Sequence, residues 1–130
     1  MTGMDTNILV RFFVQDDPDQ CRRVDILLQS LSSRSPGFVP SVALAEFAWV
    51  LRKRYGVPKA QFIRHLEKLL DSPEIVLENE AALRQALVRF GSTNADFEDC
   101  LIERVCSEAG CARTVTFDAI AAKSSGMSLL

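Results

Sequence analysis

The chain has 130 residues, of which 48% are hydrophobic and 25% are charged, and its formal net charge is −2. This length fits one domain over residues 1–130 with a core of its own, and the composition excludes a disordered or fibrous protein. No apolar run is long enough to cross a bilayer, and the N-terminus lacks the features of a signal peptide. We therefore expect a globular, cytoplasmic protein with no membrane partner.

Strand-like and helix-like patterns alternate along the chain, which predicts an α/β fold with four or five short strands. The first half predicts strands over 2–5 and 38–40 and helices over 6–14, 18–31, 41–55 and 58–70. Ser41 is expected to cap the helix over 41–55, and Gly56 is expected to end it.

The second half predicts three more strands, two long helices and a last short helix. The strands are expected over 74–77, 113–116 and 127–130, the long helices over 78–90 and 95–109, and the short helix from about Ala119. Gly91 is the expected end of the helix over 78–90.

Two carboxylates occupy helix positions where apolar residues are expected. Asp99 shares a helical stripe with Ala95 and Ile102, and Glu46 lies among the apolar residues of the helix over 41–55. A side chain in such a stripe should point toward the core or a cleft, where a carboxylate needs a partner. No Lys or Arg shares either stripe, so the partner has to come from elsewhere.

Two further acids follow predicted strands: Asp5 after the first and Asp118 after the fourth. The crevice beyond the carboxyl ends of parallel strands is the usual ligand site of an α/β fold, so Asp5, Glu46, Asp99 and Asp118 can converge there. Their mutual repulsion would be about 1–4 kcal/mol per close pair, and a divalent cation would remove it. Oxygen ligands without His or Cys favour Mg²⁺ or Mn²⁺, and such an ion can activate water to hydrolyse a phosphodiester.

Four segments in order resemble the motifs of the PIN-domain proteins, and most of all the VapC toxins of bacterial toxin–antitoxin pairs. The segments run over residues 4–10, 40–46, 95–102 and 116–118, and Gln15-Asp16-Asp17-Pro18 resembles one VapC subgroup. The resemblance covers essentially the whole chain. It implies a single PIN domain with a three-layer α/β/α fold. It also implies a metal-dependent endoribonuclease toxin that cleaves RNA, forms a homodimer and is inhibited by a VapB-type antitoxin.

The resemblance also assigns roles to individual residues. Asp5, Glu46 and Asp99 would be metal ligands or water-activating groups, Asp118 would complete the cluster, and Asp96 would be an outer ligand. Thr6 resembles the family's hydroxyl residue beside the first acid, placed to bond a carboxylate or a metal-bound water. The helix after Asp99 departs from the family because it carries Cys100, Glu103 and Arg104. We expect Glu103 and Arg104 to be exposed and the site to be intact.

Several of these residues also have purely structural interpretations. Asp5 could begin a helix, Asp96 could stabilise a helix dipole, and Asp118 could cap the last helix. His65 is expected to be a packing or surface residue. The basic run 52–54 suits the end of a helix, but with Arg11 and Lys123 it could equally attract RNA phosphates.

The four cysteines, Cys21, Cys100, Cys106 and Cys111, lack the spacing of a zinc site. Cys100 and Cys106 fall in one predicted helix and are expected to act as small core residues. The acidic net charge weighs mildly against nucleic-acid binding, although it counts acids that a metal would neutralise.

Three other functions compete with a toxin ribonuclease. One is a PIN nuclease that acts in RNA processing without an antitoxin. Another is a receiver-like phosphoacceptor domain, which would need paired acids after the first strand, whereas Asp5 stands alone. The third is a binding module that has lost activity, against which the presence of all four acids argues.

Overall fold

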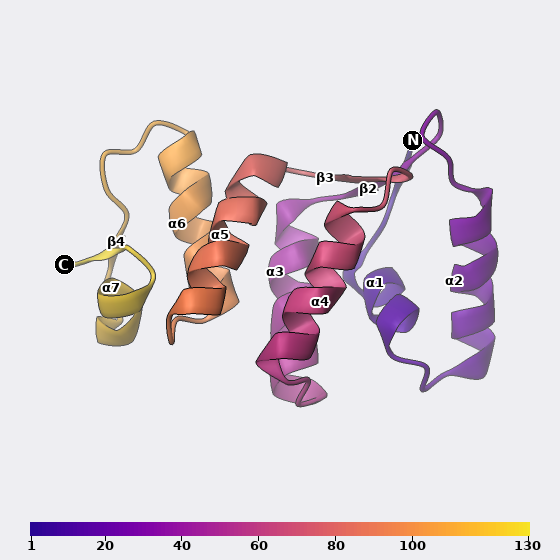
Figure 1. Cartoon of the computed structure of the whole chain (residues 1–130), viewed down its shortest axis with the longest axis horizontal. Coiled ribbons are helices and arrows are strands. Elements are labelled where there is room, and N and C mark those ends of the chain that lie inside the picture. Colours follow the sequence, from indigo (N-terminus) through magenta and orange to yellow (C-terminus); the bar gives the residue numbers. More distant parts are fainter. The chain divides into compact units, whose positions relative to one another are not determined.

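The computed structural model describes residues 1–130, which form two compact units, Met1–Glu78 and Asn79–Leu130. The first unit runs from indigo to pink in Figure 1, and the second runs from orange to yellow. None of the helices combines the length and apolar character that a membrane crossing requires.

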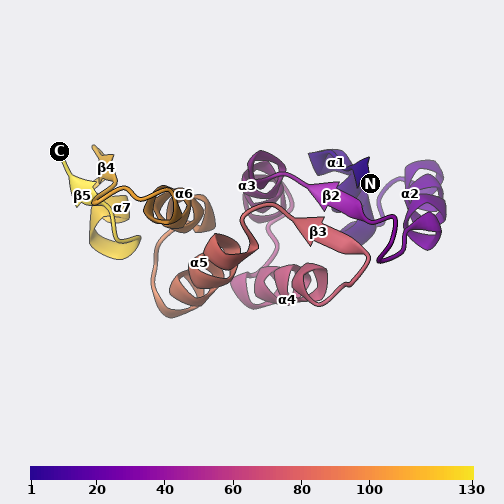
Figure 2. The same cartoon turned by 90° about the horizontal axis from the view of Figure 1, so that it is seen from above.

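The first unit is built on a three-stranded parallel sheet of β1 (Thr2–Gly3), β2 (Gly37–Val39) and β3 (Ile75–Leu77), in the order β1-β2-β3. Its helices are α1 (Thr6–Phe13), α2 (Pro18–Ser30), α3 (Ser41–Trp49) and α4 (Lys59–Leu70), and a π-helical turn, η1 (Val50–Arg54), extends α3. Figure 2 shows α1 and α3 on one side of these strands and α4 on the other. Parallel strands joined by helices on both sides confirm the predicted α/β class.

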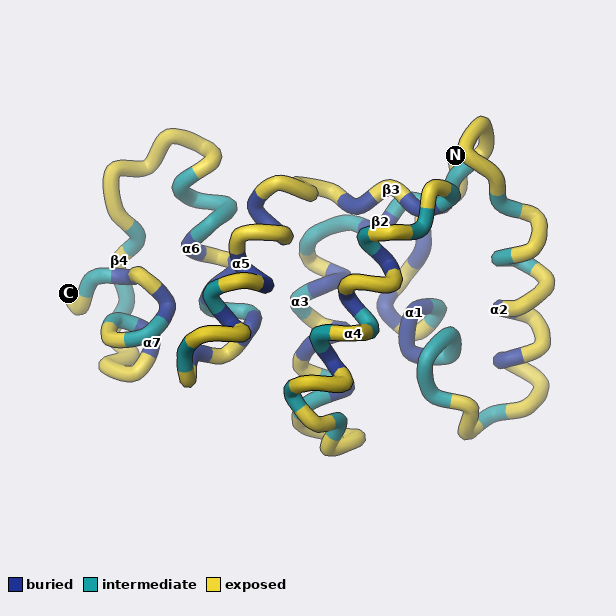
Figure 3. The backbone as a smooth tube through the Cα atoms, in the orientation of Figure 1, coloured by how far each residue is buried: buried dark blue, intermediate teal, exposed yellow.

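Aromatic side chains join the helices of the first unit. Phe47 of α3 is fully buried, and its ring centroid lies 5.6 Å from that of Phe13 in α1 and 6.1 Å from that of Phe62 in α4. In Figure 3, α2 is buried only along one narrow stripe, which consists of Cys21 and Val24. The core of this unit therefore lies mainly between the sheet, α1, α3 and α4.

The second unit consists of a helix pair and a small strand–helix–strand crossover. Helices α5 (Glu80–Ser92) and α6 (Phe97–Glu108) pack side by side (Figure 1), with the rings of Phe90 and Phe97 edge to face at 5.8 Å. Strands β4 (Val115–Thr116) and β5 (Ser128–Leu129) pair in parallel, and α7 (Ala119–Ser124) connects them. The chain thus has five parallel strands, in one sheet of three and one of two.

A cluster of hydrogen-bonded charged side chains connects the helices of the second unit. Glu103 is only 8% exposed, and its carboxylate accepts hydrogen bonds from Arg89 at 2.9 Å and from Arg104 at 2.6 Å. Arg89 also donates to the carbonyl of Ser125 at 2.6 Å. Gly126 has a φ of 90° and faces the Arg89 guanidinium so closely that a Cβ there would collide with it. Arg89 therefore ties α6 and the end of α7 to α5.

The predicted elements are confirmed, but some details were wrong. In the first unit, the N-cap residue of α3 is Pro40 and not Ser41, which is the first residue of the helix. Helix α5 continues through Gly91. The buried side of α6 carries Phe97, Cys100, Leu101 and Glu103, whereas Ile102, expected in the buried stripe, is 49% exposed. Glu103 is buried and Arg104 is half-buried, although both were expected to be exposed.

The physical reason for this difference is the position of the helix that α6 contacts. On α6, Phe97 packs against Phe90 of α5 and Arg104 donates to Gln85 of α5, so the contact with α5 decides which stripe is covered. Asp99 consequently lies at the margin of the buried side, half-exposed, and not in its centre.

Glu103→Ala should lower the free energy of unfolding by about 2–3 kcal/mol, because it leaves two partly buried guanidinium groups without their acid. The pKa of Glu103 is lowered, first by the hydrogen bond from Arg104 and then by the nearby arginine charges, while burial opposes these effects. The contribution of Glu103 is therefore fully present above its ordinary pKa of 4.5 and is lost as the pH falls through the lowered value. Urea denaturation at neutral and at acidic pH measures both effects.

Glu80→Ala is the matched control, since Glu80 forms an exposed i,i+4 ion pair with Arg84 in the same unit. We expect a change of less than about 0.5 kcal/mol. Equal losses for the two variants would show that the Glu103 cluster is no more important than a surface ion pair.

Candidate functional site

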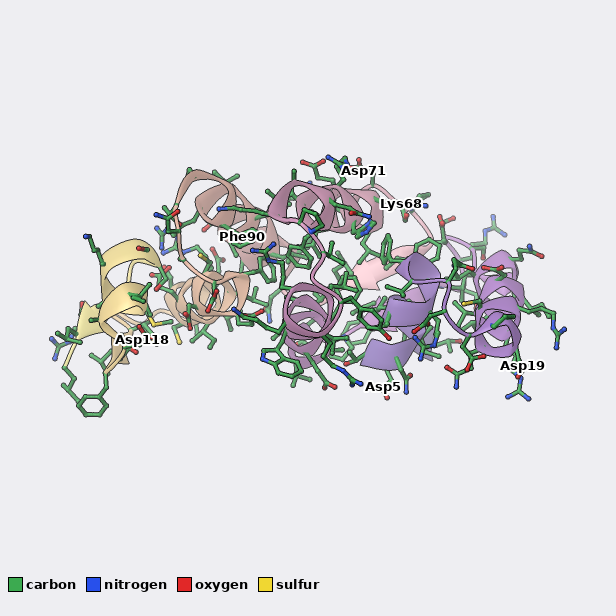
Figure 4. All side chains as sticks on the ribbon, turned by 90° about the horizontal axis from the view of Figure 1, so that it is seen from below. Asp5, Asp19, Lys68, Asp71, Phe90 and Asp118 are labelled. Carbon is green, nitrogen blue, oxygen red and sulfur yellow. The ribbon has the colours of Figure 1, made fainter.

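A pocket in the first unit contains two of the four predicted acids. Asp5 follows β1 and begins α1, and Glu46 lies on α3. The pocket has a volume of about 160 Å³ and is lined by Asp5, Thr6, Asn7, Val10, Arg11, Glu46, Val50, Arg54 and Tyr55. Figure 4 shows Asp5 at the surface of α1. The packing of α1 against α3 therefore brings the first and second acidic motifs together.

Both carboxylates of this pocket keep oxygens without a partner. Asp5 accepts one hydrogen bond, from the backbone N–H of Thr6 to Oδ1 at 2.7 Å, and its Oδ2 accepts none. Glu46 is exposed and forms neither a hydrogen bond nor an ion pair. Three carboxylate oxygens are thus available to a ligand in the pocket.

Thr6 is the one residue with a buried side-chain oxygen that lacks a partner. The residue is 5% exposed, and it lines the same pocket as the two acids. Buried hydroxyl groups are nearly always hydrogen-bonded, so an orphaned Oγ1 beside two carboxylates indicates a place for a ligand or an ordered water.

The second unit holds the remaining acids near one another. Asp96 is the N-cap residue of α6, Asp99 lies in the first turn of α6, and Asp118 is the N-cap residue of α7. Asp118 Oδ1 accepts hydrogen bonds from the N–H groups of Ile120 at 2.8 Å and Ala121 at 3.0 Å, and its Oδ2 accepts none. The third and fourth motifs thus both place acids at helix N-termini.

The pKa of Asp99 shows that these acids influence each other. It is raised, first by partial burial and then by the negative charges of Asp96 and Asp118. Asp99 forms no ion pair that would offset this effect. The ionised form of Asp99 is therefore disfavoured, and a cation close to it would be stabilising.

The donor set fits a hard divalent cation. Asp5, Glu46, Asp99 and Asp118 all lack an ion pair, and oxygen ligands of this kind suit Mg²⁺ or Mn²⁺. Neither unit alone brings three metal-binding side chains together closely enough to hold an ion. That the four acids meet at one ion remains a prediction of the sequence.

The structural interpretations of the acids are confirmed in part. Asp5 and Asp118 do cap helices, but each uses only one oxygen to do so. Capping and ligand binding are therefore compatible roles for the same side chain.

His65 and the cysteines act as packing or surface residues. The ring of His65 lies 4.2 Å from that of Phe13, and burial is the main cause that lowers its pKa. Cys100 is buried as predicted, Cys106 is half-buried, and all the cysteines are free.

The sequence did not single out one member of the pocket. Arg54 was grouped with Arg52 and Lys53 as a basic run, yet only Arg54 of the three lines the pocket with Asp5 and Glu46. The steps of four residues from Glu46 to Val50 and Arg54 are a same-face helical spacing that could have distinguished Arg54 within the basic run.

Comparison with known families gives one match. A family model described as PIN domain matches residues 4–125, a span that includes parts of both units and all the candidate site residues. None of the curated proteins compared with the chain is significantly similar to it.

Asp99→Asn should raise the melting temperature of the metal-free protein at neutral pH. Because the pKa of Asp99 is raised in the folded state, its ionisation above the ordinary value of 3.8 favours unfolding, and the amide removes that effect. Mg²⁺ or Mn²⁺ should stabilise the wild type more than the variant. Calorimetry with and without the ion tests both points.

Asp25→Asn provides the control, because Asp25 is an exposed aspartate without a hydrogen bond or ion pair. Its effect should lie within about 0.5 kcal/mol. If Asp99→Asn were destabilising, Asp99 would have a structural role instead.

Proposed function

The chain belongs to the PIN domain family, whose members are generally nucleases, and on this premise we propose that it is a Mg²⁺- or Mn²⁺-dependent endoribonuclease. We further propose that it is the VapC-type toxin of a toxin–antitoxin pair, acting as a homodimer in the cytoplasm and inhibited by a VapB-type antitoxin. The toxin role rests on the sequence resemblance of the four acidic motifs.

One observation carries the nuclease proposal: Asp5 and Glu46 line one pocket without a cationic partner, and Asp99, whose pKa Asp96 and Asp118 help to raise, has none either. An orphaned Thr6 hydroxyl lies beside two of them. A divalent ion and a phosphodiester would together satisfy these groups.

In this proposal, the carboxylates and the Thr6 hydroxyl have different roles in hydrolysis. When bound, a divalent ion would polarise the attacking water and neutralise charge that develops on the phosphate. Backbone N–H groups hold Oδ1 of Asp5 and of Asp118, so each side chain keeps Oδ2 without a hydrogen bond and available to a ligand. The Thr6 hydroxyl can donate a hydrogen bond to an oxygen of the substrate or of a bound water, because it has no hydrogen-bond partner in the protein. The carboxylates of both units serve one reaction in this proposal.

A PIN nuclease that processes RNA without an antitoxin is the second candidate, because family membership supports it equally well. A neighbouring gene for a small DNA-binding antitoxin would separate the two. The family match gives no support to a receiver-like phosphoacceptor domain.

We predict that the purified protein cleaves single-stranded RNA only when Mg²⁺ or Mn²⁺ is added. Asp5→Asn and Asp99→Asn should each lower the cleavage rate by several orders of magnitude, because each removes a charge that the ion needs. Thr6→Val keeps the shape of the side chain and should lower the rate less. Gel analysis of end-labelled RNA measures these rates.

Glu74→Gln, in the loop before β3, is the control and should cleave at the wild-type rate. Undiminished cleavage in EDTA would exclude the metal mechanism. Cleavage that is lost in Glu74→Gln as well would point to a general effect on folding.

We also predict that expression of the chain alone slows cell growth, and that co-expression of the product of an adjacent antitoxin gene restores it. Asp5→Asn should abolish the growth defect if toxicity results from RNA cleavage. Sequencing of RNA 5′ ends before and after induction measures the cleavage directly. Absence of a growth defect, together with metal-dependent cleavage in vitro, would favour the RNA-processing alternative.

A further inference from the structure

We propose that Arg54 binds a phosphate of the RNA strand beside the carboxylates of Asp5 and Glu46. This inference rests on the proposed function and adds a phosphate-binding residue to it. All three residues line the same pocket of the first unit, together with the orphaned hydroxyl of Thr6.

Arg54 reaches this pocket from the π-helical turn η1, which continues α3 beyond Glu46. The N–H of Tyr55 donates to the carbonyl of Val50 at 3.2 Å, a bond that spans five residues in place of the four of an α-helix. In an uninterrupted α-helix the residue about two turns after Glu46 would be Lys53. The wider turn moves that position on by one residue, and Glu46, Val50 and Arg54 line the pocket.

Arg54 has no partner within the protein, unlike the other arginines nearby. Arg11 lines the same pocket but donates to Asp16 and to Gln20, each at 2.8 Å. Arg52 donates to the carbonyl of Val57 at 2.9 Å. Arg54 is exposed and forms neither a hydrogen bond nor an ion pair. Its guanidinium is therefore the one in this turn and pocket that is free for a ligand.

The chemistry of the pocket matches a phosphodiester bound together with a cation. The two carboxylates attract a cation, whereas a guanidinium group binds the oxygens of a phosphate through two parallel hydrogen bonds. A ligand with only positive charge would leave Arg54 unused, and one with only negative charge would be repelled by Asp5 and Glu46. An RNA phosphate beside a divalent ion satisfies both sides of the pocket.

The test measures binding separately from cleavage. The probe is a fluorescein-labelled 2′-O-methyl RNA oligonucleotide of mixed sequence, and anisotropy gives its Kd over a range of salt concentrations, in EDTA and again in Mg²⁺. Arg54→Ala should weaken binding about tenfold, as expected for loss of a charged hydrogen bond. The slope of log K against log salt should fall by about 0.7, the value for one lost phosphate contact on a single strand.

Two further variants separate geometry from charge. Arg54→Lys keeps the charge but loses the paired hydrogen bonds, so its Kd should lie between those of Arg54→Ala and the wild type, with the wild-type salt slope. Arg64→Ala removes an exposed arginine of α4 that lies outside the pocket, and it should bind like the wild type. Melting temperatures should be unchanged in all three, because these arginines make no hydrogen bonds or ion pairs.

The outcomes distinguish this inference from the proposed function. Wild-type binding by Arg54→Ala, or equal losses in Arg54→Ala and Arg64→Ala, overturns the role of Arg54 even if the wild type cleaves RNA. The role of Arg54 is also overturned if the wild type binds the probe neither in EDTA nor in Mg²⁺. If Arg54→Ala loses binding and Arg64→Ala does not, the role of Arg54 is supported. If the wild type binds the probe but does not cleave RNA with added metal, only the nuclease proposal is contradicted.

Discussion

Hydrogen bonds at helix N-termini are the interaction on which the candidate site depends. Asp5 and Asp118 each give one carboxylate oxygen to backbone N–H groups at the start of a helix, and Asp99 lies in the first turn of another. The partial positive charge of a helix N-terminus favours carboxylates and fixes their direction. A strand that leads directly into a helix, as β1 does into α1 and β4 into α7, can therefore hold an unpaired acid in a fixed direction.

The sequence was most informative where local chemistry decides the structure. Each predicted strand and helix is present, because apolar periodicity and residues such as Pro18, Gly56 and Asp118 set element boundaries locally. The family could also be predicted, since four motifs in order carry far more information than any one of them. The meeting of all four acids at one ion is the part of that prediction that remains open.

Features that depend on packing between elements could not be predicted in the same way. The buried side of α6 is set by α5, so the exposure of Ile102 and the burial of Glu103 became clear only from the packed pair. Glu103 shows why a carboxylate in a helix is an ambiguous signal: it is more buried than Asp99, yet Arg89 and Arg104 neutralise it. A cationic partner therefore marks Glu103 as a structural acid, whereas Asp99 has a raised pKa and no ion pair.

A bound divalent ion would also make the proposed binding of RNA compatible with an acidic chain. The formal charge of −2 includes Asp5, Glu46, Asp99 and Asp118, and one divalent ion is enough to cancel it. A nucleic acid approaching the ion-loaded protein would therefore meet a smaller repulsion than the sequence charge suggests, with free cations such as Arg54 adding a local attraction. Net charge would then be a poor guide to the ligand, because a bound ion would cancel the charge of the side chains that hold it.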